Sequence, residues 1–329
     1  MSHHDDDALR KTNRHPANRL GLNYRDAPPH RLDTPIIDAH VHVHSGPSVA
    51  AFFEAATLYG VTRVVSMTPL DEVGALRAAY PGRLDFIAIP RWRSMSSSGE
   101  FQAQWIADLA AFRDQGARRM KFWMAPPMRG QYGLTLQDPF FAPIIRAALD
   151  LGYDFMIHVG DPTAWFAPGG RYADTHRFGT KREQYQQLEF LLETVAPCNV
   201  IAAHMGGNIE DPALLQDLLD RYPNLYLDSS ATKWVVREVA RQPDELRAFM
   251  LRNQDRILFG SDLVVADNCD FDHYASRYWA QQMMWETTYR GESPIEDPDA
   301  GDPPRLAGLD LPPEALRRLY HENAARLRC

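Results

Sequence analysis

Three histidines occupy alternate positions in the stretch IIDAHVHVHSG, residues 36–46, and an aspartate precedes them. Side chains alternate between the two faces of a β-strand, so Asp38, His40 and His42 would share one face. Imidazole nitrogens suit ions of the Zn²⁺ type, and two histidines at i and i+2 on one strand can reach the same ion. His44 lies beside a Gly-Pro pair that ends the run, and we interpret it as part of the following loop. The pattern therefore predicts two metal ligands, His40 and His42.

Four further apolar runs carry a residue that would suit the same site. His158 ends YDFMIH, His204 ends NVIAAH, Asp262 ends RILFGSD, and Lys121 lies within RRMKFW. A lone strand-end histidine is more often a hydrogen-bonding group than a ligand, and a lone aspartate often caps a turn. Strand alternation nevertheless points all four toward one interior at the same strand end. We therefore expect them to converge.

The predicted strands alternate with longer segments of helical period, which is the pattern of an α/β (β/α)8 barrel of the TIM type. The alternative, a doubly wound open sheet, lacks support because no GxGxxG or GxxxxGK[ST] loop follows any strand. In a barrel the strand ends named above meet at the C-terminal face, where barrel enzymes carry their active sites. The strands are expected at 36–43, 61–67, 84–90, 118–123, 153–159, 199–204, 224–230 and 256–262.

The chain is expected to have one large domain with two additions. Residues 1–33 are polar and rich in His, Asp and Arg, which predicts a flexible N-terminal arm. Residues 34–329 would form the barrel domain, with an insertion at about 264–311 after strand eight. The aromatic residues of this insertion would suit either a homodimer surface or a lid over the site, and the sequence does not distinguish these.

Composition narrows the classes of partner. A hydrophobic fraction of 45% in 329 residues is enough for a substantial core. The formal net charge of −8 argues against nucleic acid and anionic membranes as partners. We find no apolar run of transmembrane length and no signal-peptide pattern. Three widely spaced cysteines fit a reducing compartment, so a cytoplasmic protein acting on a small molecule is expected.

The motifs IDAHVHV, FMIHVGDP, VIAAHMGG, LFGSDLV and YHENAARL together resemble the amidohydrolase superfamily. Within it they resemble the amidohydrolase-related group that includes the aminocarboxymuconate-semialdehyde decarboxylase-like enzymes. The likeness runs from about residue 35 to the C-terminus, apart from the insertion. It implies one divalent ion per chain, Zn²⁺ with Mn²⁺ as the alternative, held by His40, His42, His158 and Asp262. It also implies that His204 activates or positions a metal-bound water.

The chemistry of such a site follows from general principles. A bound Zn²⁺ ion lowers the pKa of its water from about 15.7 toward about 7. An imidazole such as that of His204 can move a proton in this range. Asp262 would combine the roles of ligand and base. Lys121 would be an ammonium that binds a substrate carboxylate or an oxyanion; in binuclear relatives a lysine near this position is instead carbamylated and bridges two metals.

Residues on the predicted loops at the same end are candidates for substrate contacts. Arginines suit a carboxylate through paired hydrogen bonds, and tryptophans suit a planar or apolar group. Asp38, deeper on the first strand, is expected to orient the ligands from the second shell of the site. The expected substrate contacts, with Lys121, are Arg91, Arg93, Trp123, Trp165 and Asp228.

Three functions fit these features. The favoured one is a metal-dependent hydrolase of an amide, ester or lactone in a small, carboxylate-bearing substrate. The alternative is a non-oxidative, metal-dependent decarboxylase (a carboxy-lyase) of an aromatic or unsaturated acid. A metal-dependent binding protein without catalysis is disfavoured because the candidate proton carrier His204 accompanies every ligand.

Overall fold

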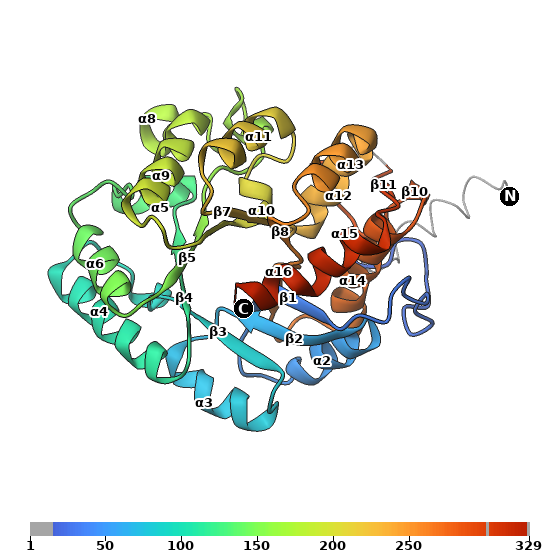
Figure 1. Ribbon diagram of the computed structural model, residues 1–329, viewed down its shortest axis with the longest axis horizontal. Helices are drawn as coiled ribbons and strands as arrows, with labels where there is room; N and C mark the ends of the chain where they lie inside the picture. The colour runs from blue at the N-terminus through green and yellow to red at the C-terminus, as the bar shows by residue number, and fades with distance from the viewer. Residues whose placement is uncertain (1–15, 301–302, 328–329) are drawn as a thin grey trace, which may run out of the picture.

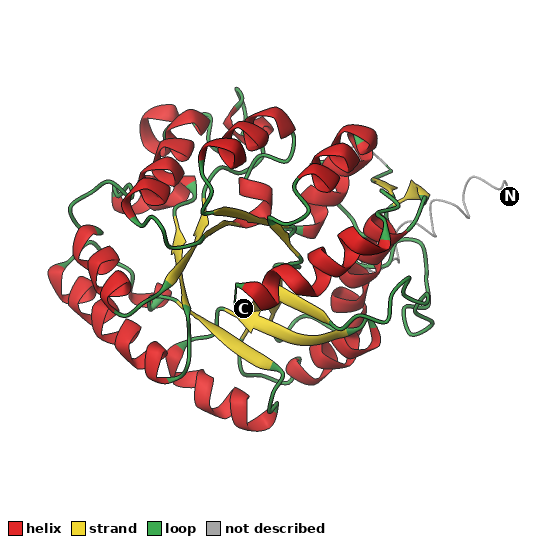
Figure 2. Cartoon of the chain, viewed as in Figure 1, coloured by secondary structure: helices red, strands yellow, loops and turns green. Residues whose placement is uncertain are grey.

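The largest sheet of the protein has nine parallel strands in the computed structural model, which describes residues 16–300 and 303–327. Their order is β8-β7-β6-β5-β4-β3-β2-β1-β9, so β1 to β8 are neighbours in the sheet in chain order and β9 pairs with β1. Figure 2 shows these strands around a ring with the helices outside it. The strands are β1 (Ile36–Val43), β2 (Val61–Ser66), β3 (Leu84–Ala88), β4 (Arg119–Trp123), β5 (Asp154–His158), β6 (Val200–Ala202), β7 (Leu225–Asp228), β8 (Ile257–Leu258) and β9 (Leu263–Val265).

The two outer strands of this order, β8 and β9, are consecutive in the chain, and the segment that joins them lies against β1. The Phe259 carbonyl accepts a hydrogen bond from the Ala39 amide at 2.9 Å, and the Asp262 amide donates to the His40 carbonyl at 2.8 Å. β1 therefore has bonded neighbours on both sides. The predicted α/β architecture of barrel type is confirmed, although the predicted strand 256–262 is shorter than expected, because the chain turns after Leu258 and resumes as β9.

Helices follow the strands and surround the sheet (Figure 1). Several of them begin at a polar residue that caps the first turn. Ser98 accepts a hydrogen bond from the Phe101 amide, and Thr180 and Glu183 form a reciprocal capping box. The helices are α2 (Val49–Leu58), α3 (Leu70–Ala79), α4 (Gly99–Asp114), α5 (Pro126–Tyr132), α6 (Ala142–Asp150), α7 (Thr163–Phe166), α8 (Thr175–Phe178), α9 (Lys181–Thr194), α10 (Ala203–Gly206), α11 (Pro212–Arg221), α12 (Thr232–Arg241), α13 (Pro243–Arg252), α14 (Phe271–Glu286), α15 (Pro313–Arg317) and α16 (Asn323–Arg326).

The outward faces of the strands pack on these helices. Phe122 on β4 is fully buried between Trp105 of α4, Phe141 and Phe155, with ring centroids 5.8–6.3 Å apart. Burial of one such side chain stabilises the fold by about 1.5–3 kcal/mol. The inward-facing neighbour Lys121 is left to the interior of the ring, as strand alternation requires.

Residues 264–311 contribute β9, α14 and a two-stranded sheet of β10 (Arg290–Glu292) and β11 (Arg305–Ala307). α14 contacts α2 and α12. Its side chains Tyr274, Tyr278 and Trp285 are at most 2% exposed, because they pack into the molecule rather than project from it. These aromatic residues are therefore part of the core.

The N-terminal region packs on α14. Asn18 donates to Asp272 at 3.0 Å, and the Glu286 carboxylate is bonded to the His30 ring and accepts from the Arg31 amide, each at 2.7 Å. Of the predicted arm, residues 16–33 form a contacting segment, whereas residues 1–15 lie outside the described residues. Among the helices of the described ranges, none has the length and apolarity that crossing a membrane requires.

Candidate metal centre and the adjoining cavity

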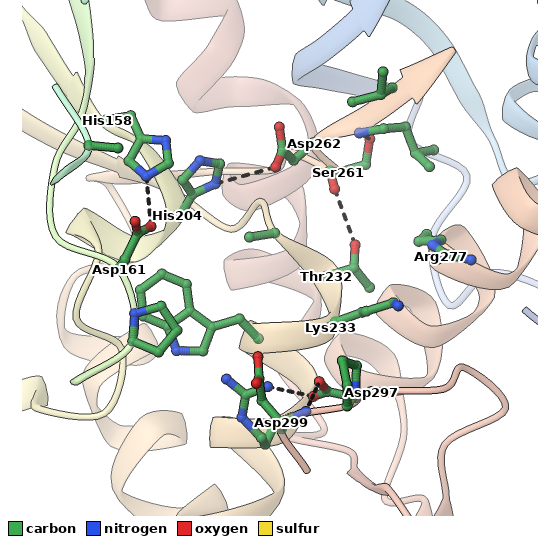
Figure 3. A pocket seen from close by; sticks show the side chains of 18 of the residues that line it. His158, Asp161, His204, Thr232, Lys233, Ser261, Asp262, Arg277, Asp297 and Asp299 are labelled. Carbon is green, nitrogen blue, oxygen red and sulfur yellow. Dashed lines mark hydrogen bonds and ion pairs between the residues drawn. The ribbon is translucent and has the colours of Figure 1, made fainter. Parts of the chain in front are cut away.

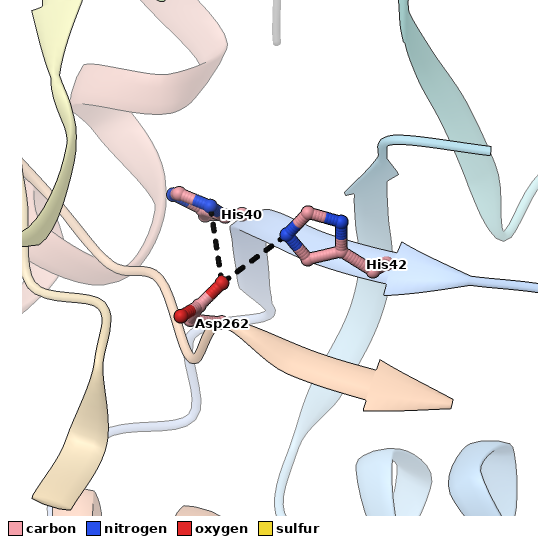
Figure 4. Close-up of side chains that lie close together, drawn as sticks. All are labelled: His40, His42 and Asp262. Carbon is pink, nitrogen blue, oxygen red and sulfur yellow. Dashed lines mark ion pairs between the residues drawn. The ribbon is translucent and has the colours of Figure 1, made fainter. Parts of the chain in front are cut away.

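His40, His42 and Asp262 meet at the C-terminal end of β1 (Figure 4). The Asp262 Oδ1 atom lies 3.3 Å from His40 Nε2 and 3.2 Å from His42 Nε2. Asp262 occupies the turn between β8 and β9 with a positive φ of 58°, a strained conformation for a residue other than glycine. Its amide is bonded to the His40 carbonyl, and this bond fixes the carboxylate beside the two imidazoles.

The spacing of these three atoms fits a single metal ion. Zn–N and Zn–O bonds of about 2.0–2.1 Å in a tetrahedron place neighbouring ligand atoms about 3.3 Å apart. The two observed separations match that value. The donor set, two imidazoles and one carboxylate, also suits a borderline divalent ion and leaves room for a further ligand.

Asp228, the last residue of β7, orients His40. Its Oδ2 atom lies 2.8 Å from His40 Nδ1, and Ser230 Oγ is 3.1 Å from the same nitrogen. A carboxylate that accepts the Nδ1 proton leaves the lone pair of Nε2 free to bind the ion that His40 and Asp262 would share. Burial opposes ionisation of Asp228, but the facing His40 outweighs it and holds the pKa of the carboxyl well below its usual range. Asp228 is fully buried, so its predicted role as a substrate contact is replaced by that of a residue positioning His40.

Asp38 supports the backbone of the site. Its carboxylate accepts hydrogen bonds from the Ser261 amide and hydroxyl, from Tyr278, and from the His40 amide. None of these four bonds involves an imidazole ring, so Asp38 holds the turn before Asp262 instead of orienting a ligand ring. Burial raises the pKa of Asp38 to about 6, although these hydrogen bonds oppose the shift.

His204 lies beside the cluster, two residues beyond the end of β6. The strand ends at Ala202, and His204 and Met205 adopt left-handed conformations with φ of 58° and 51°. The His204 ring centroid is 4.9 Å from that of His40, and its Nδ1 atom lies 2.8 Å from Ser230 Oγ. Burial lowers the pKa of His204 well below its ordinary value, which favours a neutral imidazole at pH 7.

His158, the last residue of β5, lies near His204 but points Nε2 at another partner. That atom is 2.9 Å from Asp161 Oδ1, and the two histidine rings are 4.5 Å apart. The loops after β5 and β6 approach closely at Gly207, where a Cβ would overlap the Val159 carbonyl oxygen. To become a metal ligand through Nε2, His158 would have to leave Asp161.

Lys121 faces the same cluster from β4. Its Nζ atom lies 3.4 Å from His40 Nε2, and the side chain is buried. Burial lowers its pKa to about 8, partly offset by Asp228 and Asp262. An ammonium here is close enough to interact with an anion bound at the candidate metal centre.

Two adjoining cavities open at the cluster. Trp123, His158, His204, Asp262 and Val264 line both of them. The first, which we call the aromatic lobe, has a volume of about 500 Å³ and is also lined by His44, Met67, Ile89, Trp92, Lys121 and Tyr132. The second, which we call the cationic lobe, has a volume of about 610 Å³ and is also lined by Trp165, Arg171, Lys233 and Arg277 (Figure 3).

The predicted substrate contacts divide between these cavities and the surface. Trp123 lines both lobes and Trp165 lines the cationic lobe. Among the described residues around either lobe, neither Arg91 nor Arg93 occurs: Arg91 is paired with Asp108 at 2.7 Å, and Arg93 is exposed.

The residue between these two arginines, Trp92, does line the aromatic lobe, because the chain forms a 3₁₀ turn there (Trp92–Ser94). Sequence reasoning also missed Lys233 and Arg277. In the sequence these residues could have been found as a basic residue shortly after the seventh strand and another in the segment after the eighth.

A family model described as amidohydrolase matches residues 37–327, nearly the whole chain. The chain belongs to the amidohydrolase family. The resemblance seen in the motifs is thereby confirmed. Members of this family are metal-dependent, and the His40–His42–Asp262 cluster is the corresponding feature of this chain. The protein is thus a member of a family of enzymes.

Solved structures share the amidohydrolase fold. One is a probable 2-pyrone-4,6-dicarboxylic acid hydrolase from Acinetobacter baumannii with citric acid bound, which is 14% identical with a TM-score of 0.51 over 89% of this chain and 98% of that one. Another is a 5-carboxyvanillate decarboxylase from Sphingomonas paucimobilis, 11% identical with a TM-score of 0.53 over 90% of this chain and 99% of that one. Among proteins with curated descriptions, none matches the chain by sequence.

Proposed function

We propose that this amidohydrolase hydrolyses an amide, ester or lactone bond in a small acidic molecule. The observation that carries the proposal is the position of Asp262 and His204 between two lobes of different character. A substrate that spans both lobes would present its central bond to these residues. Hydrolysis separates two parts of a molecule, so a site with one lobe for each part suits this reaction better than one with a single closed pocket.

The residues have distinct proposed roles. His40, His42 and Asp262 would hold a divalent ion, Zn²⁺ or Mn²⁺, which when bound supplies Lewis-acid polarisation of a carbonyl and activation of water. His204, with a pKa lowered by burial, can accept a proton as a neutral imidazole at pH 7. Trp92 and Trp123 provide planar apolar walls for the part of the substrate in the aromatic lobe.

His158 and Lys121 complete the proposed site. His158 is a fourth candidate ligand whose Nε2 atom is engaged by Asp161. We assign Lys121 the role of an ammonium that stabilises negative charge next to His40. This assignment implies one metal ion per chain; two equivalents by elemental analysis would instead indicate a carbamylated Lys121 bridging two ions.

A decarboxylase of an aromatic acid is the second candidate function. The observation that favours it is the aromatic lobe itself, in which Trp92, Trp123 and Tyr132 surround a space that also contains the Lys121 ammonium. An aromatic ring would stack on the walls while its carboxylate lies near the lysine.

Product analysis separates the two reactions. The zinc-loaded protein is incubated with matched sets of aromatic acids, lactones and amides, and both CO₂ and the hydrolysis products are measured. Hydrolysis without CO₂ supports the proposal, whereas CO₂ release without hydrolysis would refute it. As a control for contaminating activity, His42→Ala should abolish turnover and lower the metal content, because it removes one of the three clustered ligand atoms.

A further inference from the structure

The cationic lobe contains two basic side chains that lack carboxylate partners in the described part of the chain. Arg277, on α14, donates to the His273 carbonyl and to Ser276 Oγ, both at 3.0 Å. Lys233, in the first turn of α12, has no hydrogen bond or ion pair among the described residues. Figure 3 shows both side chains at the same side of the lobe.

The acidic residues around this lobe are already engaged by other groups. Asp161 is bonded to His158, Asp297 is paired with Arg237 at 2.5 Å, and Asp299 accepts from the Trp165 indole at 3.2 Å. Asp262 faces the histidines of the candidate metal centre. Asp297, Glu296 and Asp299 attract Lys233 only from beyond ion-pair distance, so among the described residues no carboxylate directly contacts Lys233 or Arg277.

The two cations are close enough to influence each other. Burial lowers the pKa of Lys233 and the positive charge of Arg277 lowers it further, whereas Asp297, Glu296 and Asp299 oppose the shift. Burial also lowers the pKa of Arg277, to about 10, which leaves the guanidinium charged at pH 7. Two like charges that partly lose their water are stabilised by an anion bound between them.

The first turn of α12 adds backbone donors at the same place. Ala231, Thr232, Lys233 and Trp234 line the lobe, and the N-cap residue Ala231 provides no side-chain cap. The first N–H groups of a helix attract negative charge when no side chain satisfies them. These donors complement the two cations and share their preference for an anion.

We propose that Lys233 and Arg277 bind a carboxylate of the ligand in the cationic lobe, so that the ligand is an acid with an apolar or aromatic part in the aromatic lobe. The inference deepens the proposed function, on which it rests for the statement that this acid is a substrate. Arg171 stacks on Trp165 at 4.1 Å and is exposed, and Arg237 is neutralised by Asp297, so neither takes the principal role.

Binding calorimetry with zinc-loaded protein tests the proposal without requiring turnover. The probe is isophthalate, a benzene ring with two carboxylates, and its neutral counterpart is isophthalamide. Wild-type protein should bind isophthalate more tightly. Lys233→Gln and Arg277→Gln should each weaken isophthalate binding by about tenfold or more, because each removes one charged donor. Binding of isophthalamide should change little.

Arg93→Gln is the matched control, since it removes one positive charge from an exposed site outside both lobes. Lys233→Arg should retain much of the affinity, which separates loss of charge from loss of structure. Wild-type affinity for isophthalate in either glutamine variant would overturn the proposal, as would equal binding of the two probes by the wild type. Because no reaction is measured, an incorrect assignment of the reaction would leave these results unchanged.

Discussion

The substitution Asp228→Asn tests how the site prepares His40 for a metal ion. Asp228 Oδ2 faces His40 Nδ1 at 2.8 Å, while Oδ1 accepts from the amides of His204 and Ser230 at 2.9 and 3.1 Å. An asparagine of the same shape must keep its oxygen toward the two amides, and its NH₂ group then faces His40. The imidazole proton would move to Nε2, the atom that the ion requires.

The expected size of the effect follows from the bond that is lost. A hydrogen bond to a charged group contributes about 1.5–3 kcal/mol, which at about 1.36 kcal/mol per tenfold corresponds to a factor of about 10–100. Outer-shell partners of metal ligands typically contribute to metal affinity in the same range. The dissociation constant for Zn²⁺ should therefore rise by about 10- to 100-fold, and excess Zn²⁺ should restore occupancy.

Competition with a chromophoric chelator measures this constant directly. Asp38→Asn is the matched control, because Asp38 is equally buried but accepts its hydrogen bonds from backbone and hydroxyl groups. It should affect thermal stability more than zinc affinity. Wild-type zinc affinity in Asp228→Asn, or an equal loss in Asp38→Asn, would refute the assignment of Asp228 as the residue that orients His40.

Three further predictions concern the cluster, acid stability and a buried ion pair. Asp262→Ala should lose both bound metal and turnover, whereas His204→Ala should lose turnover but keep much of its metal, as measured by elemental analysis. An Asp262→Ala variant that is active and fully loaded with metal would contradict this. Burial raises the pKa of Glu286, but hydrogen bonds outweigh burial and hold the pKa below 4.5. The ionised carboxylate therefore stabilises the fold above about pH 4.5, and this contribution is lost as the pH falls. In urea titrations the free energy of unfolding of Glu286→Gln should depend less on pH in the acid range than that of the wild type. Asp297→Asn removes one partner of the buried Arg237 and should lower the free energy of unfolding by about 1–3 kcal/mol in denaturant melts, and an unchanged value would count against that pair.

The sequence alone predicted the fold and the convergence of His40, His42 and Asp262. Each predicted strand contains an observed strand, because short apolar runs reflect burial on both faces of a parallel barrel sheet. The alternation of side chains along a strand predicted that His40 and His42 would share a face, and the structure brings both to Asp262. The family resemblance agreed with this arrangement.

Local backbone geometry was not predictable in the same way. His204 and Asp262 both lie beyond the ends of the strands assigned to them, in left-handed conformations with φ of 58°. Tertiary contacts stabilise these conformations, such as the bond from the Asp262 amide to the His40 carbonyl. Strand periodicity carries no information about such bonds.

Residue type was also an incomplete guide to the lining of the cavities. Arg91 and Arg93 have the charge expected for an acidic substrate, but in the 3₁₀ turn of residues 92–94 it is Trp92 that lines the cavity. Asp228 was expected to contact the substrate, yet it ends a strand and is fully buried. In both cases the exact position of a residue in its turn or strand decides whether its side chain lines the cavity.

Two consecutive residues of α14 support different parts of the candidate site. Arg277 lines the cationic lobe, and Tyr278 donates to Asp38, which in turn holds the turn that carries Asp262. A change that tilts this helix to admit a different acid would therefore also displace Asp262, a candidate metal ligand. Variation in substrate preference should accumulate more readily around Trp92, because within the described residues its 3₁₀ turn makes no hydrogen bond to Asp38 or Asp262, so the two lobes differ in how freely the protein can evolve new specificities.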